Sequence, residues 1–511
     1  MGNFQFIGGA HNHLMKKPFM VMDYNTTEGG TGHPGFICRK QPAIEKHLRS
    51  RIEDLAESQL RLSATVTSIS EDEDWFLVGA DGKTGYTRKK YLEPKGILIE
   101  KVSQMPYEET WVALNWKINL PNPETHPEFP LWEKGYTPEM VYDAFFPSDF
   151  RFLCNPKRQR FEFVVLPGED GNVMAGSDKI REIVYPYITH PGRDYGLDSK
   201  EIQFPSDCIE VLRSRPFNFS ARSCNKWALN RAILCGDAAH VFPPFGGQGI
   251  ASGFRDAISL VWRLLLATRQ PRQTDQISCH ALFEGWYTER KQQLDKSLAS
   301  TIENGSYVTQ ADPVKIFFRD WESKRRNDTI QLAGRKRTGI LAPLGRGFDF
   351  PQVYCVNLND EQGSKSVQFT DDVIFAPGKK GFFQLVVFLR SVSDLQIAQE
   401  TIEGLQDAWE GVLRMDEVTY LVGGTNHPPA SIQGTNIYRL ATGQVFAAHP
   451  VLCAGRPEPQ YYDPNRIIHD SRGKQFVIVR PDRFVFAACD TRSELREAAA
   501  ELSSIAHRNF H

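Results

Sequence analysis

The stretch from Ala232 to Ile250, with the helix predicted after it, constrains the fold most strongly. Ala232 to Cys235 are apolar, which is typical of a short buried strand. Gly236 and Asp237 end that strand, and a loop rich in proline and glycine follows. Apolar residues then recur at helical spacing, which predicts a long helix beginning near Gly249. These residues are Ile250, Phe254, Ile258, Val261 and Leu265.

A strand, an acidic residue at its end and a glycine loop that opens a helix form a ligand-binding corner. The first N–H groups of a helix are unpaired and carry partial positive charge, which favours an electron-rich ligand. Asp237 can accept hydrogen bonds from ligand hydroxyl groups. The alternative is an ordinary strand–turn–helix corner without a ligand, which a lone Gly-Asp pair would favour.

The whole spaced pattern resembles the second flavin motif of the class A FAD-dependent aromatic monooxygenases, which have the para-hydroxybenzoate hydroxylase fold. The pattern comprises Gly236, Asp237, His240, Pro243, Gly246, Gly247, Gln248, Gly249, Gly253 and Asp256. The resemblance implies that Asp237 holds the ribityl chain of FAD, that Gly236 beside it belongs to the cofactor site, and that the loop from Pro243 to Gly249 lies along the isoalloxazine. The helix N-terminus would face the flavin edge where negative charge collects on reduction.

Two segments on the N-terminal side of this motif stand in the same order as their counterparts in that family. Gln41-Pro42 opens a predicted helix, since proline suits the first helical position. In the family a residue at this helix start reaches FAD, so Arg39 and Gln41 stand at the matching place; a plain surface helix is the alternative. Strands are predicted near residues 64–69 and 75–80.

The second of these strands ends in Asp81-Gly82. The resemblance places Asp81 and Gly82 near the FAD pyrophosphate and the path of the nicotinamide coenzyme, with Arg88 able to pair with a phosphate. Taken alone, Ala-Asp-Gly is a common turn.

Strands are also predicted at residues 111–118 and 160–166. The run from Arg160 to Glu169 resembles the 3-(3-hydroxyphenyl)propionate hydroxylase and phenol hydroxylase branch. In that family this segment is a sheet that roofs the flavin and contacts the substrate. No catalytic base is assigned. A second long helix is predicted from about residue 282 to near Asn304-Gly305.

The C-terminal third predicts a strand at 382–389, a helix at 395–409, a strand at 418–422, a hairpin at 476–488 turning at Pro481-Asp482, and a helix at 492–506. This order fits a thioredoxin-like module, which the phenol hydroxylase branch carries at its C-terminus. Without Cys-x-x-Cys it lacks dithiol chemistry. Packing or a homodimer contact is its expected role.

We therefore predict a mixed α/β (α+β) fold: a Rossmann-like FAD/NAD(P)-binding domain, an inserted antiparallel substrate sheet and a C-terminal thioredoxin-like domain. The predicted segments are 1–100 (partial FAD-binding), 101–220 (substrate sheet), 221–340 (FAD-binding with long helices) and 350–511 (thioredoxin-like). The Rossmann unit is expected to be incomplete at its N-terminus. The glycine-rich run Gly29–Gly35 follows no apolar strand, and Pro34 interrupts a helix there.

The composition of the chain limits the kinds of partner that we expect it to bind. A net charge of −2 over 511 residues gives no basic excess for nucleic acid. No apolar run approaches the length of a membrane span. The nine cysteines are scattered without Cys-x-x-Cys, so no metal site is expected, and a reducing, cytoplasmic location is predicted.

The resemblance implies a monooxygenase that uses FAD, with NAD(P)H as co-substrate and O2, to hydroxylate a small phenolic or aromatic substrate, in secondary metabolism. Two alternatives stay open. One is a degenerate or truncated flavoprotein without catalysis that acts as a scaffold or dimer partner. The other is a Baeyer–Villiger-type flavin oxidoreductase.

Overall fold

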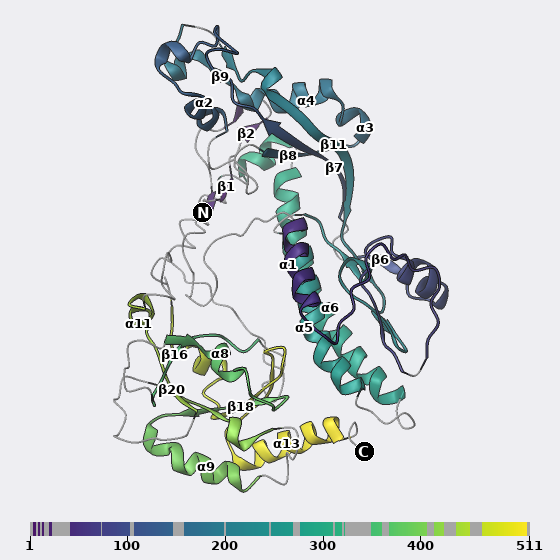
Figure 1. Ribbon diagram of the computed structural model, residues 1–511, viewed down its shortest axis with the longest axis vertical. Coiled ribbons are helices and arrows are strands. Elements are labelled where there is room, and N and C mark those ends of the chain that lie inside the picture. Colours follow the sequence, from purple (N-terminus) through teal and green to yellow (C-terminus); the bar gives the residue numbers. More distant parts are fainter. Residues whose placement is uncertain are drawn as a thin grey trace.

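The computed structural model describes most of the chain, in segments. These are residues 4–6, 9–10, 13–14, 20–22, 41–72, 74–102, 107–146, 158–198, 201–244, 247–268, 276–309, 312–318, 321, 349–359, 367–405, 413–423, 436–449 and 462–507. Figure 1 shows an antiparallel sheet at one end of the long axis, long helices in the middle and the C-terminal sheet at the other end.

A short parallel strand pair lies at the base of the predicted ligand corner. β14 (Ala232–Leu234) pairs in parallel with β5 (Leu77–Gly79), and β13 (Ala228–Leu229) completes this sheet. The residues of β14 are fully buried, which explains the unbroken apolar run of the sequence. A second small sheet has the order β15 (His240–Val241), β12 (Arg222–Cys224) and β6 (Ile99–Lys101).

The strand expected near residues 64–69 is wrong. The described residues there form no strand, and all but Ile69 are exposed. β5 therefore stays at the edge of its sheet, and the side chain of Val78 is exposed. Further towards the N-terminus, β1 (Phe4–Phe6) pairs with β4 (Met20–Met22), and β2 (Gly9–Ala10) pairs with β3 (His13–Leu14).

Long helices fill the middle of the molecule (Figure 1). α5 (Gln248–Thr268) begins one residue before its predicted start. α6 (Gln276–Thr309) continues through Asn304-Gly305, so its predicted end there is wrong. Gly305 is buried inside the helix, where a glycine costs only about 1 kcal/mol. α1 (Gln41–Glu53) also forms as predicted.

The apolar stripe that predicted α5 lies on its exposed side. Ile250, Phe254, Ile258, Val261 and Leu265 all have more than two fifths of their surface exposed. The opposite face of α5 is buried instead. It combines apolar residues with polar ones, namely Ser252, Asp256, Ser259, Leu260, Trp262, Arg263, Leu266 and Ala267. The periodicity thus identified the helix but not the side that it buries.

The sheet that the sequence analysis expected to contact substrate is antiparallel, with the order β11 (Ile209–Ser220), β7 (Glu108–Ile118) and β8 (Arg158–Val164). One face of β7 packs against α2 (Pro138–Phe145) and α4 (Ser177–Val184), with Trp116 fully buried in this core. α3 (Gly171–Met174) lies on the same sheet, and β9 (Thr189–Pro191) pairs with β10 (Glu201–Gln203). β7 and β8 confirm the strands predicted here.

The C-terminal sheet has the order β17 (Val367–Phe369), β16 (Tyr354–Asn357), β20 (Ile437–Leu440), β19 (Thr419–Val422), β18 (Gln384–Leu389), β21 (Phe476–Val479) and β22 (Val485–Cys489). β18, β19 and β20 are parallel, and β21 and β22 form the predicted hairpin.

Alternate residues of β18 face two different cores, as the strand period requires. Leu385 and Val387 pack with α9 (Leu395–Glu403) and α13 (Arg492–His507). Val386 and Phe388 pack on the other face with α8 (Thr370–Ile374) and α12 (Arg466–Asp470). A further short helix, α11 (Gly443–Ala447), follows β20.

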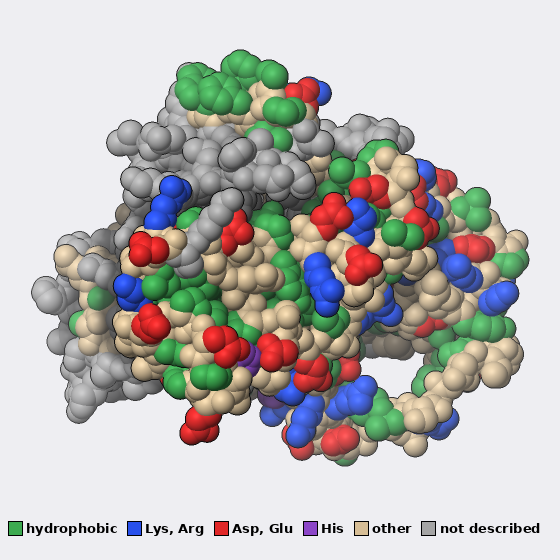
Figure 2. Space-filling model, turned by 90° about the horizontal axis from the view of Figure 1, so that it is seen from above, with side chains coloured by type: hydrophobic (Ala, Val, Ile, Leu, Met, Phe, Trp, Pro, Cys, Tyr) green, Lys and Arg blue, Asp and Glu red, His purple; other side chains and the backbone are tan. Residues whose placement is uncertain are grey.

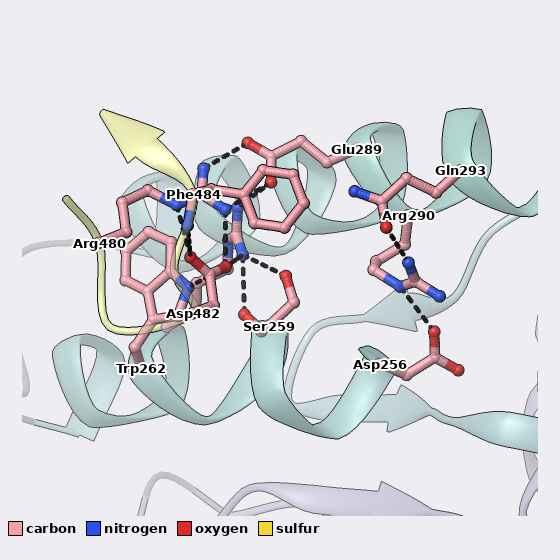
Figure 3. Close-up of polar contacts among 10 residues, drawn as sticks. Asp256, Ser259, Trp262, Glu289, Arg290, Gln293, Arg480, Asp482 and Phe484 are labelled. Atoms are coloured by element: carbon pink, nitrogen blue, oxygen red, sulfur yellow. Dashed lines mark hydrogen bonds and ion pairs between the residues drawn. The ribbon is translucent and has the colours of Figure 1, made fainter. Parts of the chain in front are cut away.

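The hairpin turn joins this C-terminal part to the long helices. Arg480 donates to Glu289 of α6 at 2.8 and 2.9 Å and to Asp482 at 2.9 and 2.7 Å. Trp262 of α5 donates from its indole nitrogen to Asp482 at 2.9 Å, and Arg263 donates to Glu289 at 2.8 Å. Figure 3 shows Arg480, Asp482, Trp262 and Glu289 converging between α5, α6 and the turn. Buried charges are thus paired across a contact between distant segments.

Within the described residues, none of the helices combines the length and the apolar character needed to cross a bilayer. On the face seen in Figure 2, acidic and basic side chains are interspersed.

Candidate functional site

Acidic motifs follow the ends of the neighbouring strands β5 and β14. The strands are parallel, Leu234 lies opposite Gly79, and the Cys235 N–H donates to the Gly79 carbonyl at 2.9 Å. The chain therefore leaves both strands at the same edge of the sheet, towards Asp81 in one case and Gly236-Asp237 in the other. Ligands of open α/β sheets bind outside the carboxyl ends of such strands.

Gly236 brings the end of β14 against α5. Its φ of +57° lies in the left-handed region, which glycine adopts without strain. A Cβ atom added to Gly253 of α5 would lie 3.7 Å from the Gly236 Cα. The strand end and the first turns of the helix therefore lie so close that a single added methyl group would reach from one backbone to the other.

Asp256 of α5 stabilises this corner through its hydrogen bonds. Its side chain is fully buried on α5 and accepts the Gly236 N–H at 3.0 Å, His240 Nε2 at 2.7 Å and Arg290 Nε at 2.8 Å. Burial acts to raise the pKa of Asp256, but the hydrogen bonds and charges of His240 and Arg290 hold that pKa below its usual value. Figure 3 shows Asp256 facing Arg290 across the two helices.

Arg290 and His240 complete the buried network. Arg290 of α6 is 2% exposed and also reaches the Ser252 carbonyl and hydroxyl oxygens, at 3.3 and 3.1 Å. His240 is fully buried, and its ring lies 4.9 Å from that of Trp227, between centroids. These contacts make His240 a structural residue. Sequence reasoning missed Arg290, because an arginine in a charged stretch of helix gives no sign that it is buried.

Asp237 behaves differently from Asp256. It is exposed, and none of the residues described by the structure donates a hydrogen bond to its carboxylate. In the loop that follows, Pro243 is buried, Gly247 has a φ of +62°, and α5 begins at Gln248. A Cβ atom on Gly249 would lie 3.9 Å from that of Phe242. Gly246 lies outside the described residues.

Asp81 accepts the Thr87 N–H at 2.8 Å and so caps the helical turn η1 (Thr87–Leu92). Gly82 has a φ of +82°, with open space beside it. The expectation that Arg88 pairs with a phosphate is wrong in this structure. Arg88 is 2% exposed and already donates to Glu93 and to the Lys83 carbonyl, so its charge serves the turn.

Within the part of the chain that the structure describes, no hydrogen bond or ion pair links Gln41 to the corner. It is exposed at the first residue of α1 and donates to Glu45 of the same helix at 3.0 Å. Among the described residues, no hydrogen bond or ion pair joins α1 to the loop after β14. Arg39 lies outside the described residues.

The chemistry of this corner is compatible with the hydroxyl groups and ring of a flavin. A carboxylate that is exposed and accepts no hydrogen bond from the described residues, glycines at positive φ and a helix N-terminus meet at one sheet edge. Cys235 beside them is no nucleophile, because burial raises its pKa to about 12.

The chain is similar in sequence to known flavoproteins and hydroxylases. The family described as "FAD binding domain" matches residues 200–278. The chain is 24% identical over 343 residues to a 3-(3-hydroxy-phenyl)propionate/3-hydroxycinnamic acid hydroxylase of Klebsiella pneumoniae subsp. pneumoniae, covering 61% of this chain and 56% of that protein. It is 29% identical over 190 residues to the corresponding hydroxylase of Escherichia coli O139:H28, covering 37% and 28%.

Solved structures share the fold. The flavin-dependent monooxygenase PieE, in complex with FAD and substrate, superposes with a TM-score of 0.56 at 14% identity, covering 99% of this chain and 87% of that chain. OxyS anhydrotetracycline hydroxylase from Streptomyces rimosus gives 0.50 at 18% identity, covering 95% and 82%.

The chain is thus a mixed α/β protein that is similar to FAD binding domains over residues 200–278 and shares its fold with flavin-dependent monooxygenases. In sequence it is similar to aromatic hydroxylases. The chain spans about half the length, or less, of the curated relatives that it matches.

Proposed function

We propose that the chain binds FAD and, with NAD(P)H and O2, hydroxylates a small phenolic substrate. The observation that carries the proposal is the corner at the carboxyl ends of β5 and β14. There the exposed Asp237 carboxylate lies beside the N-terminus of α5 and accepts no hydrogen bond from any residue that the structure describes.

The proposed roles follow from position. Gly236 and Asp237 hold the ribityl hydroxyl groups, and the loop from Pro243 to Gly249 lies along the flavin ring. Asp81 and Gly82, at the neighbouring strand end, lie near the pyrophosphate, with Gln41 and Arg39 as further contacts. When bound, FAD would supply the redox chemistry between NAD(P)H, O2 and an electron-rich ring.

The substrate is proposed to lie against the sheet of β7, β8 and β11. The relatives are named for hydroxyphenylpropionate and hydroxycinnamic acid, which supports a phenolic substrate here. A phenolic compound of secondary metabolism is the class that the sequence resemblance favours.

The four segments predicted from the sequence remain a proposal, as does the thioredoxin-like nature of the last one. The order β18, α9, β19, hairpin and α13 supports it. A homodimer contact is its proposed role. The free cysteines of the described part, such as Cys355 and Cys489, favour a reducing, cytoplasmic location.

The test is retention of flavin. The full chain is incubated with excess FAD and passed through gel filtration, and its absorbance spectrum is recorded. Asp237→Ala should weaken FAD binding about 10- to 100-fold, the loss expected for charged hydrogen bonds of about 1.5–3 kcal/mol. Asp198→Ala, which removes an exposed carboxylate elsewhere, should bind FAD normally.

The other outcomes of this test distinguish the proposed enzyme from the two alternatives. A folded but colourless chain would favour a scaffold or dimer partner without catalysis. Retained flavin with substrate-stimulated NAD(P)H oxidation supports the enzyme. The structure of the product then separates hydroxylation of the ring from the oxygen insertion of a Baeyer–Villiger-type reaction.

A further inference from the structure

A histidine, an aspartate and a cysteine meet at one end of the substrate sheet, away from the corner at β5 and β14. His126 lies in the segment after β7, and Asp207 and Cys208 form η7 (Ser206–Cys208) directly before β11. β7 and β11 are antiparallel neighbours, and the Asn119 N–H donates to the Cys208 carbonyl at 2.8 Å. The sheet therefore brings the two segments together.

The three side chains converge on one nitrogen. His126 Nε2 lies 3.0 and 3.1 Å from the Asp207 carboxylate oxygens and 3.6 Å from Cys208 Sγ. The potential ligand atoms of the three residues all lie within 4.8 Å of one another. Cys208 is buried and His126 is half-buried, whereas Asp207 is exposed.

The other ring nitrogen of His126 is also engaged. His126 Nδ1 lies 2.8 Å from Thr125 Oγ1, whose hydroxyl group in turn has the Asn122 carbonyl oxygen as an acceptor at 3.3 Å. Nδ1 is thus held by a neutral hydroxyl group, while Nε2 faces both the Asp207 carboxylate and the Cys208 sulfur. Nε2 is therefore the nitrogen that could bind a cation together with these two groups.

The arrangement does not suit a nucleophilic relay. In such a relay the thiol and the carboxylate contact opposite nitrogens of the histidine. Here both are on Nε2, and a neutral hydroxyl group holds Nδ1. Thiolate, imidazole and carboxylate pointing to one centre are instead the ligands that zinc prefers, and a hydrogen bond on the second imidazole nitrogen is the usual support for a metal-bound histidine.

We propose that His126, Asp207 and Cys208 form a three-ligand zinc site with a fourth position open to water. Zn–S and Zn–N bonds of about 2.3 and 2.0 Å in tetrahedral geometry place two ligand atoms about 3.5 Å apart. His126 Nε2 and Cys208 Sγ are 3.6 Å apart. Asp207 is closer to Nε2 than a shared metal permits, and its exposed side chain is free to rotate outward by the small amount required. Binding releases the thiol proton.

Cobalt(II) is the probe for this site, because tetrahedral Co²⁺ with a thiolate ligand gives visible and charge-transfer bands that zinc lacks. The full chain is treated with a chelator, freed of flavin and titrated with Co²⁺, and Zn²⁺ is then added as a competitor. The expected result is about one Co²⁺ per chain with a thiolate band that Zn²⁺ abolishes.

Matched variants locate the site. Cys208→Ser should lose the thiolate band, and His126→Ala should weaken Co²⁺ binding at least tenfold. Cys355→Ser removes another buried thiol and should change nothing. The same holds for His469→Ala, which removes a histidine that pairs with Asp463 at 3.1 Å. Thr125→Val keeps all three ligands and should weaken binding about tenfold through loss of the Nδ1 contact.

A chain that binds no Co²⁺, or a thiolate band that persists in Cys208→Ser, would overturn the proposal. The cluster would then be a hydrogen-bonded contact of His126 with Asp207 that holds no metal. Circular dichroism of each variant separates loss of the metal from loss of the fold. The proposal does not depend on flavin binding, so the two tests can fail separately.

Discussion

His240 and Asp256 form a fully buried pair, with 2.7 Å between the imidazole Nε2 and the carboxylate. The same carboxylate oxygen accepts the backbone N–H of Gly236 at 3.0 Å. The strand end that carries Asp237 is therefore fixed by Asp256, which lies on α5. Through Arg290, that residue also joins α5 to α6.

Replacing Asp256 by alanine should destabilise the protein by about 3–5 kcal/mol, because the buried Arg290 would lose its counter-charge. Urea unfolding measures this change. Asp295→Ala, which removes an exposed partner of Lys291 on α6, should cost at most about 0.5 kcal/mol. Equal losses for the two variants would show that the Asp256 network contributes no special stability.

Gly236 and Gly253 face each other across the corner, but they should respond differently to alanine. Gly236→Ala places a Cβ atom on a residue with a φ of +57° and should cost about 1–2 kcal/mol. Gly253→Ala brings a Cβ atom only to 3.7 Å from the Gly236 Cα, an ordinary contact, and the helix gains up to about 1 kcal/mol in propensity. Thermal unfolding should therefore rank Gly253→Ala above Gly236→Ala. The reverse order contradicts the backbone geometry of the corner.

Acid should unfold the protein through two carboxylates that are paired in the folded state, the buried Asp256 and the partly exposed Glu289. Burial acts to raise the pKa of Asp256 and of Glu289, but their hydrogen bonds and neighbouring charges hold each pKa below its ordinary value of 3.8 or 4.5. The folded pKa thus lies below the unfolded one. The stabilisation is complete above the unfolded pKa and is lost as the pH falls through the folded pKa.

The free energy of unfolding should therefore fall steeply below about pH 5. Urea titrations at a series of pH values measure this slope. Glu289→Gln should flatten it, whereas Glu303→Gln, at an exposed position of the same helix, should leave it unchanged. A slope that Glu289→Gln does not alter would assign the acid sensitivity to other groups.

Arg480 should control the coupling between the C-terminal part and the long helices. Arg480→Ala leaves Asp482 and Glu289 without their main counter-charge and should cost about 3–5 kcal/mol. Calorimetry should show one transition for the parent chain and two for the variant, because the contact at the turn is lost. Arg193→Ala, at an exposed ion pair, is the control. A single transition in Arg480→Ala at the parent temperature would refute this role.

The sequence by itself determined the elements that depend on local patterns. The apolar run of β14, the start of α5 and the hairpin around Pro481-Asp482 were all predicted, since each is set by neighbouring residues. The motif at Gly236-Asp237 was also visible, because glycine, proline and aspartate at fixed spacing are rare by chance. The strand at 64–69 failed because a strand needs a partner edge, which local sequence does not specify.

Only the tertiary structure decided which side of α5 is buried and which charges meet. Helical periodicity reports a stripe, but the buried face is set by packing partners, and here it carries Asp256 and Trp262. The partner of Trp262 at the turn, Asp482, lies 220 residues away in the chain. His126 and Cys208 meet for the same reason, since antiparallel pairing of β7 and β11 joins segments far apart in the sequence. Such polar contacts carry no local pattern, because burial and pairing are properties of the folded chain.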